Sequence, residues 1–399
     1  MTPPRAHPAE APARTRWSRV LLLWACGILG GMQFAKISVA FQPLQVLYGV
    51  GPAPMGWVLS AVGLVGLALG VTMGLFATAI GVRRLLLGGL ALGATLSAAQ
   101  SLLPPFPLLL VSRMLEGASH LAIVVAAPTL IGASCAPQHR AIAMGLWSTF
   151  VGVAFALMAA VGSGVIARSG LDGLLQLHAL GMAGMLVWLL AATRRDPHPE
   201  PAPWPPLRTL LRQHAAVYTD FHTVLPGLTF FCYTAVAVAL LTFVPPWTGA
   251  DRAWLAVVLP LMVIAGNFGA GWLVQHWLAP LQLARVAFSA VALAALWLGW
   301  SHAAGQRLGA PALALLFTSG LAGGSAFALI PYLCHDSRTQ ARANGAVAQM
   351  GNLGSSCGPP LLAACSAQWG IGGLVGPAVL ASVLGFALAS WARRHLARR

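Results

Sequence analysis

The sequence predicts an all-α integral membrane protein in which twelve transmembrane helices form two pseudo-symmetric six-helix bundles. Of the 399 residues, 58% are hydrophobic and only 8% are charged, and the mean hydropathy is +0.78. Soluble domains carry about 25% charged residues, so this composition excludes a soluble fold. Crossing a bilayer takes about 20 apolar residues. Twelve segments meet that length, at 18–42, 54–78, 84–103, 107–133, 141–167, 172–193, 221–245, 252–275, 282–302, 308–333, 343–367 and 372–392.

An internal repeat supports the division into two halves. Gly117 of the fourth segment recurs as Gly320 of the tenth at an offset of 203 residues, and Arg140 recurs as Arg342 at an offset of 202. Further glycines, prolines and arginines repeat at the same offsets, which are close to half the chain length. Parallel repeats of six helices place their functional site near the midplane between the halves.

These observations predict five regions along the chain. The linker contains six prolines within ten residues, which favours an extended spacer. Its stretch 207–218 is basic and amphipathic, and we expect it either on the inner membrane surface or as a solvated loop helix. The regions are a disordered cytoplasmic N-terminus at 1–17, an N-terminal bundle at 18–193, a cytoplasmic linker at 194–220, a C-terminal bundle at 221–392 and a basic cytoplasmic tail at 393–399.

The net charge of +15 has a topological explanation. With the N-terminus placed in the cytoplasm, eighteen arginines fall in cytoplasmic segments and three, at Arg168, Arg252 and Arg307, fall outside. This bias predicts a multi-pass protein of the inner or plasma membrane with both termini in the cytoplasm. The positive charge is explained by the orientation of the chain in the lipid bilayer, so we expect no nucleic-acid partner.

Three sequence motifs point to one family. The segment 74–84 reads GLFATAIGVRR and is similar to the loop G-x-L-A-D-R-x-G-R-R between helices 2 and 3 of that family, departing at Thr78 and Ala79. Segment 113–117 reads RMLEG and resembles R-x-x-Q-G, while 354–359 reads GSSCGP and resembles G-x-x-x-G-P. With the twelve segments and the repeat, the chain resembles the major facilitator superfamily over nearly its whole length.

The resemblance implies a secondary active transporter that works by alternating access. It also implies a cytoplasmic gating loop, whose matching residues here are Gly74, Gly81, Arg83 and Arg84. The central cavity of the family is lined by its helices 1 and 4, which correspond to 18–42 and 107–133 in this sequence. No cofactor and no metal are implied, and a monomer is expected.

Charged side chains inside these two segments are the strongest site candidates. Lys36 is the only lysine of the chain, and burying a charge at membrane depth costs roughly 3 kcal/mol on insertion scales. At 1.5 Å per helical residue, Lys36 and Arg113 lie about 9 Å deep and Glu116 about 13 Å deep. We therefore expect one buried cluster, in which Lys36 and Arg113 bind the substrate. Because two cations face one carboxylate, the site has a net positive charge and favours an anion or a zwitterion as the substrate. A structural Arg113–Glu116 pair that fixes the two helices is the alternative.

Proton coupling and two further contacts complete the candidate site. Arg113, Glu116 and His120 share one helix face, and this ladder is a candidate proton path from Glu116 to His120. If the substrate draws Lys36 or Arg113 away from Glu116, the carboxylate can take a proton, which would couple the two events. His120 could equally be a packed neutral histidine. Gln33 lies three residues before Lys36 and is a candidate substrate contact. Gln349 is another, with interhelical hydrogen bonding as its alternative role.

The sequence thus predicts a secondary active transporter of a small organic anion or zwitterion, coupled to protons. An efflux pump for drugs, metabolites or metal-chelating molecules is the first alternative, and a membrane sensor without transport is the second. A membrane-embedded enzyme is disfavoured because the sequence has one intramembrane acid and no HExxH spacing. The sequence contains no Walker motif, which excludes ATP-driven transport by this chain alone.

Overall fold

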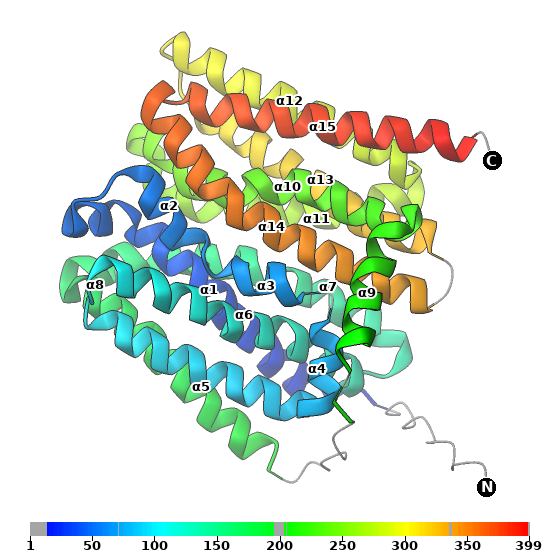
Figure 1. Cartoon of the computed structure of the whole chain (residues 1–399). Helices are drawn as coiled ribbons and strands as arrows, with labels where there is room; N and C mark the ends of the chain where they lie inside the picture. The colour runs from blue at the N-terminus through cyan, green and yellow to red at the C-terminus, as the bar shows by residue number, and fades with distance from the viewer. Residues whose placement is uncertain (1–13, 71, 195–202, 205, 335–336, 398–399) are drawn as a thin grey trace, which may run out of the picture.

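A computed structural model describes residues 14–70, 72–194, 203–204, 206–334 and 337–397. Within these ranges all regular secondary structure is helical, as predicted (Figure 1). Residues 1–13 of the predicted disordered N-terminus and residues 195–202 and 205 of the predicted linker lie outside the described residues. The last helix continues to Ala397, through most of the predicted tail 393–399.

The first half of the chain consists of eight α-helices. They are α1 (Trp17–Tyr48), α2 (Pro52–Ser60), α3 (Gly63–Leu69), α4 (Met73–Ile80), α5 (Val82–Ser101), α6 (Phe106–Ser134), α7 (Arg140–Ser148) and α8 (Phe150–Ala192). The second half follows the linker helix α9 (Leu207–Thr219). It comprises α10 (Phe221–Phe243), α11 (Arg252–His276), α12 (Pro280–Ala303), α13 (Gly309–Leu333), α14 (Ser337–Trp369) and α15 (Gly372–Ala397).

These helices make twelve passages, although not every passage is one helix. Nine helices of the described chain are long and apolar enough to cross a membrane, and the pair α2 and α3, bent by 53°, makes a tenth. Helix α8 is kinked at Gly170, whose φ of 73° favours glycine, so this helix supplies two passages. The remaining passage is α14, which carries more polar residues than the others. The predicted single segment 54–78 is wrong in detail, because α2, α3 and α4 divide it.

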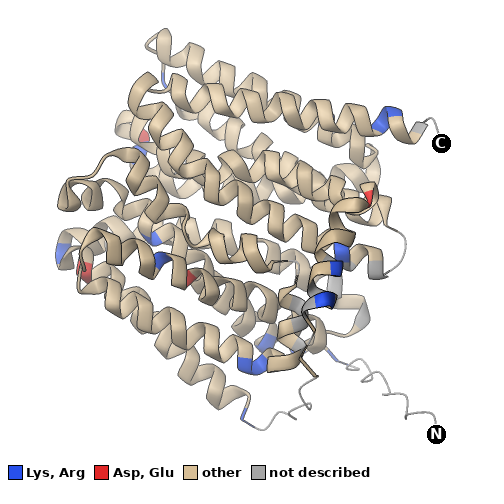
Figure 2. Cartoon of the chain, viewed as in Figure 1, with Lys and Arg blue, Asp and Glu red and all other residues tan. Residues whose placement is uncertain are grey.

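The two halves lie side by side with both ends of the chain on one face (Figure 1). We call the face where α1 begins and α15 ends the terminal face, and the other the opposite face. Helix α9 lies across the terminal face (Figure 1). Lysine and arginine residues gather towards the terminal face (Figure 2). Buried apolar residues form a core in each half, and a larger core joins the halves.

Glycines of the broken second passage make the tight contact between the halves. A Cβ added to Gly63 or Gly66 would collide with α14, at Ser356 and Asn352 respectively. Small residues allow such close approach, and from the sequence alone the glycine runs at 63–74 and 351–358 predict close contacts between the halves. The same prediction is wrong for the glycines of α14 at 351, 354 and 358, which face α10 within their own half.

Replacing Gly66 by valine is expected to lower the stability of the folded protein by about 1–3 kcal/mol, because the added side chain overpacks the contact with α14. Thermal unfolding of the purified protein in detergent measures this loss. The matched control is Gly184→Val in α8, where an added Cβ meets nothing within 4 Å. Equal unfolding temperatures for the two variants would show that the glycine contact does not hold the halves together.

Candidate functional site

The structure brings the three intramembrane charges together inside the first half. Lys36 of α1 and Arg113 and Glu116 of α6 are all 0% exposed. The Lys36 Nζ lies 2.8 Å from Glu116 Oε1, and the Arg113 guanidinium donates to Glu116 Oε2. Each carboxylate oxygen therefore has its own cation. The group, which we call the charge cluster, carries one more positive than negative charge.

Three polar residues that sequence reasoning did not assign to the site surround Lys36. Its Nζ donates to Ser97 Oγ at 2.5 Å and to Gln100 Oε1 at 2.8 Å, and both residues belong to α5. The Gln100 amide in turn donates to Glu116 Oε2 at 2.8 Å. His178 of α8 has its Nδ1 at 2.7 Å from Ser97 Oγ and 3.4 Å from Lys36 Nζ. Lys36 is thus held by side chains alone.

The hydrogen bonds of His178 define which of its nitrogens can accept a proton. Nε2 lies 3.1 Å from the carbonyl oxygen of Leu29, which can only accept, so Nε2 carries the ring hydrogen. In the neutral ring the lone pair then sits on Nδ1, directed at Lys36 and Ser97. A proton acceptor therefore lies beside the only lysine of the chain.

Arg113 differs from Lys36 in that it also binds the backbone of two neighbouring helices. Its Nε donates to the carbonyl oxygen of Val58 in α2 at 3.0 Å, and its Nη2 donates to the carbonyl oxygen of Gln33 in α1 at 2.6 Å. These backbone contacts agree with the structural role considered for Arg113. Gln33 is 0% exposed, and its side-chain amide donates to Ser119 Oγ at 2.8 Å.

His120 does not extend the charge cluster as a ladder. Its Nδ1 donates to the carbonyl oxygen of Gly30 at 3.1 Å, and its ring lies edge-on to Phe34 with centroids 5.2 Å apart. The described partners of Glu116 are Lys36, Arg113 and Gln100. The predicted proton path from Glu116 to His120 is therefore not formed in this conformation, and His178 takes the place beside the cluster.

Gln349 lies away from the charge cluster, at the terminal end of the contact between the halves. Its side-chain amide donates to the carbonyl oxygen of Leu67 in α3, and its Oε1 accepts from the Tyr218 hydroxyl of α9 at 2.6 Å. These bonds connect α14 to the first half and to the linker helix. They correspond to the interhelical role considered for Gln349, and no contact joins it to the cluster among the described residues.

Replacing Tyr218 by phenylalanine is expected to lower stability by about 1 kcal/mol, the net value of one hydrogen bond. Partial burial raises the pKa of the Tyr218 phenol above its usual value of about 10. The phenol is then protonated at neutral pH, so its contribution is present below pH 10 and is lost as the pH rises through the raised pKa. Thermal unfolding from pH 7 to pH 11 tests this, with Tyr332→Phe on α13 as the control. A stability difference independent of pH would contradict it.

The predicted gating loop is a tight turn between α4 and α5. Gly81 has a φ of 92°, which side chains rarely adopt, and Gly74 lies within α4. The Arg83 Nε donates to Thr193 Oγ1 at 2.7 Å, which ties the loop to the end of α8. Arg84 is exposed. In the part of the chain that the structure describes, no three His, Cys, Asp or Glu residues are grouped as they would be around a metal.

Two halves of six passages each, which meet on small residues and bury charges at membrane depth, are the architecture of a membrane transporter. Residues 23–359 match the Major Facilitator Superfamily, and the chain belongs to this family, as its motifs predicted. It is 24% identical over 353 residues to the 3-(3-hydroxy-phenyl)propionate transporter of Escherichia coli (strain K12). This match covers 85% of this chain and 84% of that protein.

Solved structures show the same fold. A bacterial homolog of the human lysosomal transporter Spinster, crystallised in an inward-facing and occupied conformation, matches with a TM-score of 0.73 and 15% identity over 95% of this chain and 97% of that chain. Its inward-facing and unoccupied conformation matches with a TM-score of 0.72 and 14% identity over 95% and 98% of the two chains. At these identities the similarity establishes the fold and not the substrate.

Proposed function

We propose that this protein carries a small organic carboxylate together with a proton across the membrane by alternating access. The observation that carries the proposal is the excess positive charge of the charge cluster, in which Lys36 and Arg113 share the single carboxylate of Glu116 at 0% exposure. The relative from Escherichia coli is named as the transporter of a propionate, which is a carboxylate. An anion is the ligand that neutralises this cluster.

Charge balance explains why a proton would accompany the anion. A net charge at membrane depth is costly. Without substrate the cluster has one excess positive charge, so losing one proton makes it neutral. With a bound carboxylate the cluster is neutral only if it keeps that proton. Arg113 stays protonated in proteins and is bound to two backbone carbonyls. Lys36, bound by side chains and adjacent to Nδ1 of His178, is the group that can release the proton. Glu116 and Arg113 then act as fixed counter-charges in both states.

The distribution of basic residues supports a membrane orientation. Lysine and arginine gather towards the terminal face (Figure 2), and positively charged segments remain in the cytoplasm during membrane insertion. We therefore place both termini in the cytoplasm and the chain in the inner or plasma membrane. Both halves of the fold come from one chain, so we expect a monomer to be sufficient for transport.

Proton movement in proteoliposomes tests the proposal. An inward gradient of 3-(3-hydroxyphenyl)propionate is imposed on vesicles that contain a pH-sensitive dye, and protein-free vesicles correct for acid that crosses the lipid unaided. We expect the lumen to acidify as the anion enters, at a rate independent of a membrane potential set with potassium and valinomycin. The uncharged amide of the same compound should give no pH change. Anion uptake that follows the membrane potential without acidification would refute coupling to a proton.

A further inference from the structure

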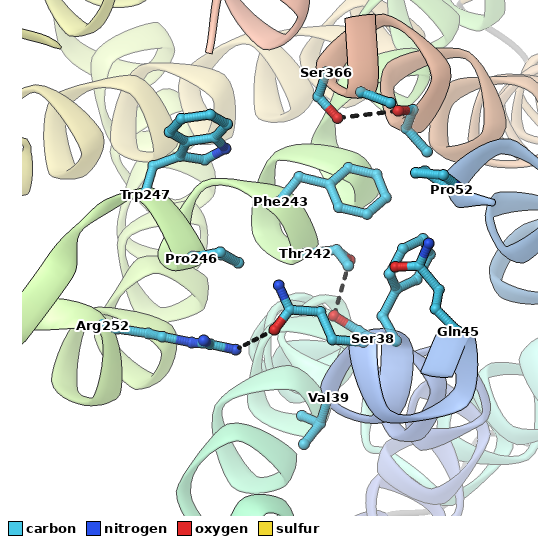
Figure 3. A pocket seen from close by; sticks show the side chains of 14 residues that line it. Ser38, Val39, Gln45, Pro52, Thr242, Phe243, Pro246, Trp247, Arg252 and Ser366 are labelled. Carbon is cyan, nitrogen blue, oxygen red and sulfur yellow. Dashed lines mark hydrogen bonds between the residues drawn. The ribbon is translucent and has the colours of Figure 1, made fainter. Parts of the chain in front are cut away.

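A second candidate site lies between the halves at the opposite face (Figure 3). It is a pocket of about 170 Å³, bordered by the end of α1, the start of α2, the end of α10, the start of α11 and the end of α14. Sites for drug-sized ligands enclose roughly 300–1,000 Å³, so this pocket suits a small molecule.

The pocket is closed towards the interior of the protein. The hydroxyls of Ser38 and Thr242 lie 2.8 Å apart and join α1 to α10 (Figure 3). The rings of Phe41 and Phe243 pack edge-on with centroids 4.9 Å apart. Ser38 is two residues from Lys36 on α1, a rise of about 3 Å, and residues at this spacing point to nearly opposite sides of a helix. Lys36 points into the first half and Ser38 towards α10, so the pocket lies on the side of α1 that faces the second half, a short distance along the helix from the charge cluster.

The pocket contains a cation whose described contact is neutral. The Arg252 guanidinium donates to the amide oxygen of Gln42 at 3.2 Å (Figure 3), and no ion pair of Arg252 occurs among the residues the structure describes. The neighbouring carboxylate of Asp251 accepts from the indole of Trp254 at 2.9 Å. A guanidinium has five donor hydrogens in a planar fork that fits a carboxylate, so most of the donors of Arg252 remain available.

The surroundings of Arg252 suit the remainder of a small aromatic acid. Trp247 offers a ring at the border of the pocket, with the amide of Gln45 and the hydroxyl of Ser366 on the lining (Figure 3). An aromatic or aliphatic body can rest on the indole ring while its carboxylate meets the guanidinium. The pocket thus combines one cation, a few polar groups and an apolar wall.

We propose that this pocket is a waiting site at which a small carboxylate binds to Arg252 on its way to or from the charge cluster. The proposal rests on the proposed function for its ligand class. A carboxylate forms a stronger hydrogen bond to a guanidinium than a neutral amide does, so the ligand displaces Gln42. Because the Arg252–Gln42 contact joins α11 to α1, and hence the two halves, its loss loosens the closure at this face.

Saturation binding to the full-length protein in lipid nanodiscs tests the waiting site. With radiolabelled 3-(3-hydroxyphenyl)propionate we expect two sites per chain in the wild type. Arg252→Gln should weaken one of them at least tenfold, and Lys36→Met should remove the other. Arg252→Lys keeps the charge and should retain part of the affinity. Arg307→Gln is the matched control, because Arg307 is also exposed and lies in the loop before α13 at the same face.

The outcomes separate this inference from the proposed function. A binding curve unchanged by Arg252→Gln overturns the waiting site even if the anion is transported. An Arg252-dependent site in a protein that moves no anion upholds the waiting site while the proposed function fails. A wild type that binds no carboxylate at millimolar concentration overturns both. Competition by the uncharged amide as strong as that by the acid would also overturn the waiting site, because the guanidinium would then not be the recognition element.

Discussion

Replacing Glu116 by glutamine is expected to destabilise the folded protein by about 3–5 kcal/mol, the cost of removing one partner from a buried ion pair. Glu116 is the only acid in contact with Lys36 and Arg113 among the described residues, and all three are 0% exposed. The variant leaves two cations at membrane depth without a counter-charge. We expect a large fall in the unfolding temperature and in the yield of monodisperse protein.

Charge balance predicts a different result for Lys36→Met, because this variant leaves Arg113 and Glu116 as a neutral pair. Its stability should stay close to that of the wild type. The triple variant Lys36→Met, Arg113→Met and Glu116→Gln should recover most of the loss, since apolar replacement of buried charges is often neutral or stabilising. If Glu116→Gln were as stable as Lys36→Met, Glu116 would already be protonated in the folded protein and the excess charge would be larger than we describe.

The second large effect concerns transport by variants of Lys36. Lys36→Met should lower the rate of carboxylate uptake by about 10- to 100-fold, because a hydrogen bond to a charged group is worth about 1.5–3 kcal/mol and 1.4 kcal/mol corresponds to a factor of ten. The folded state of this variant is preserved by the neutral Arg113–Glu116 pair. Uptake into proteoliposomes measures the effect, with Arg307→Gln as the control.

Lys36→Arg separates anion binding from proton release. An arginine keeps its positive charge but does not release its proton in proteins. The variant should exchange labelled for unlabelled anion across the membrane, a process in which the loaded protein alone reorients. Net uptake with a proton should be lost, because the empty variant cannot release the proton and keeps an excess positive charge that prevents its return. Proton-coupled uptake at the wild-type rate would exclude Lys36 as the proton carrier.

The sequence was sufficient for the fold because bilayer crossing constrains segment length and composition so strongly. Apolar runs and the repeat predicted the two bundles, and depth along α1 and α6 predicted that Lys36, Arg113 and Glu116 share one layer. The division of the second passage was not predicted, although its glycines were noted. Those glycines contact α14 closely and the passage is bent by 53°, and hydropathy carries no information about bending.

The remainder of the site could not be predicted, because it depends on contacts between helices. Ser97 and Gln100 have the spacing of one helix face, but only packing shows that this face of α5 turns towards Lys36. His178 is distant in sequence from every other member of the cluster, whereas His120 has the favourable spacing and a different partner. Spacing within a helix predicts neighbours on that helix, whereas the imidazole beside Lys36 comes from another helix, α8.

The backbone contacts of Arg113 link the charge cluster to the contact between the two halves. Its guanidinium binds Glu116 on one side and the Val58 carbonyl of α2 on the other, two residues from Gly56, whose added Cβ would collide with Pro360 of α14. Arg113 therefore connects the charge cluster to the helix that packs against α14 of the other half. A displacement of Glu116 would move the Arg113 guanidinium and, through its hydrogen bond, the Val58 carbonyl beside that contact.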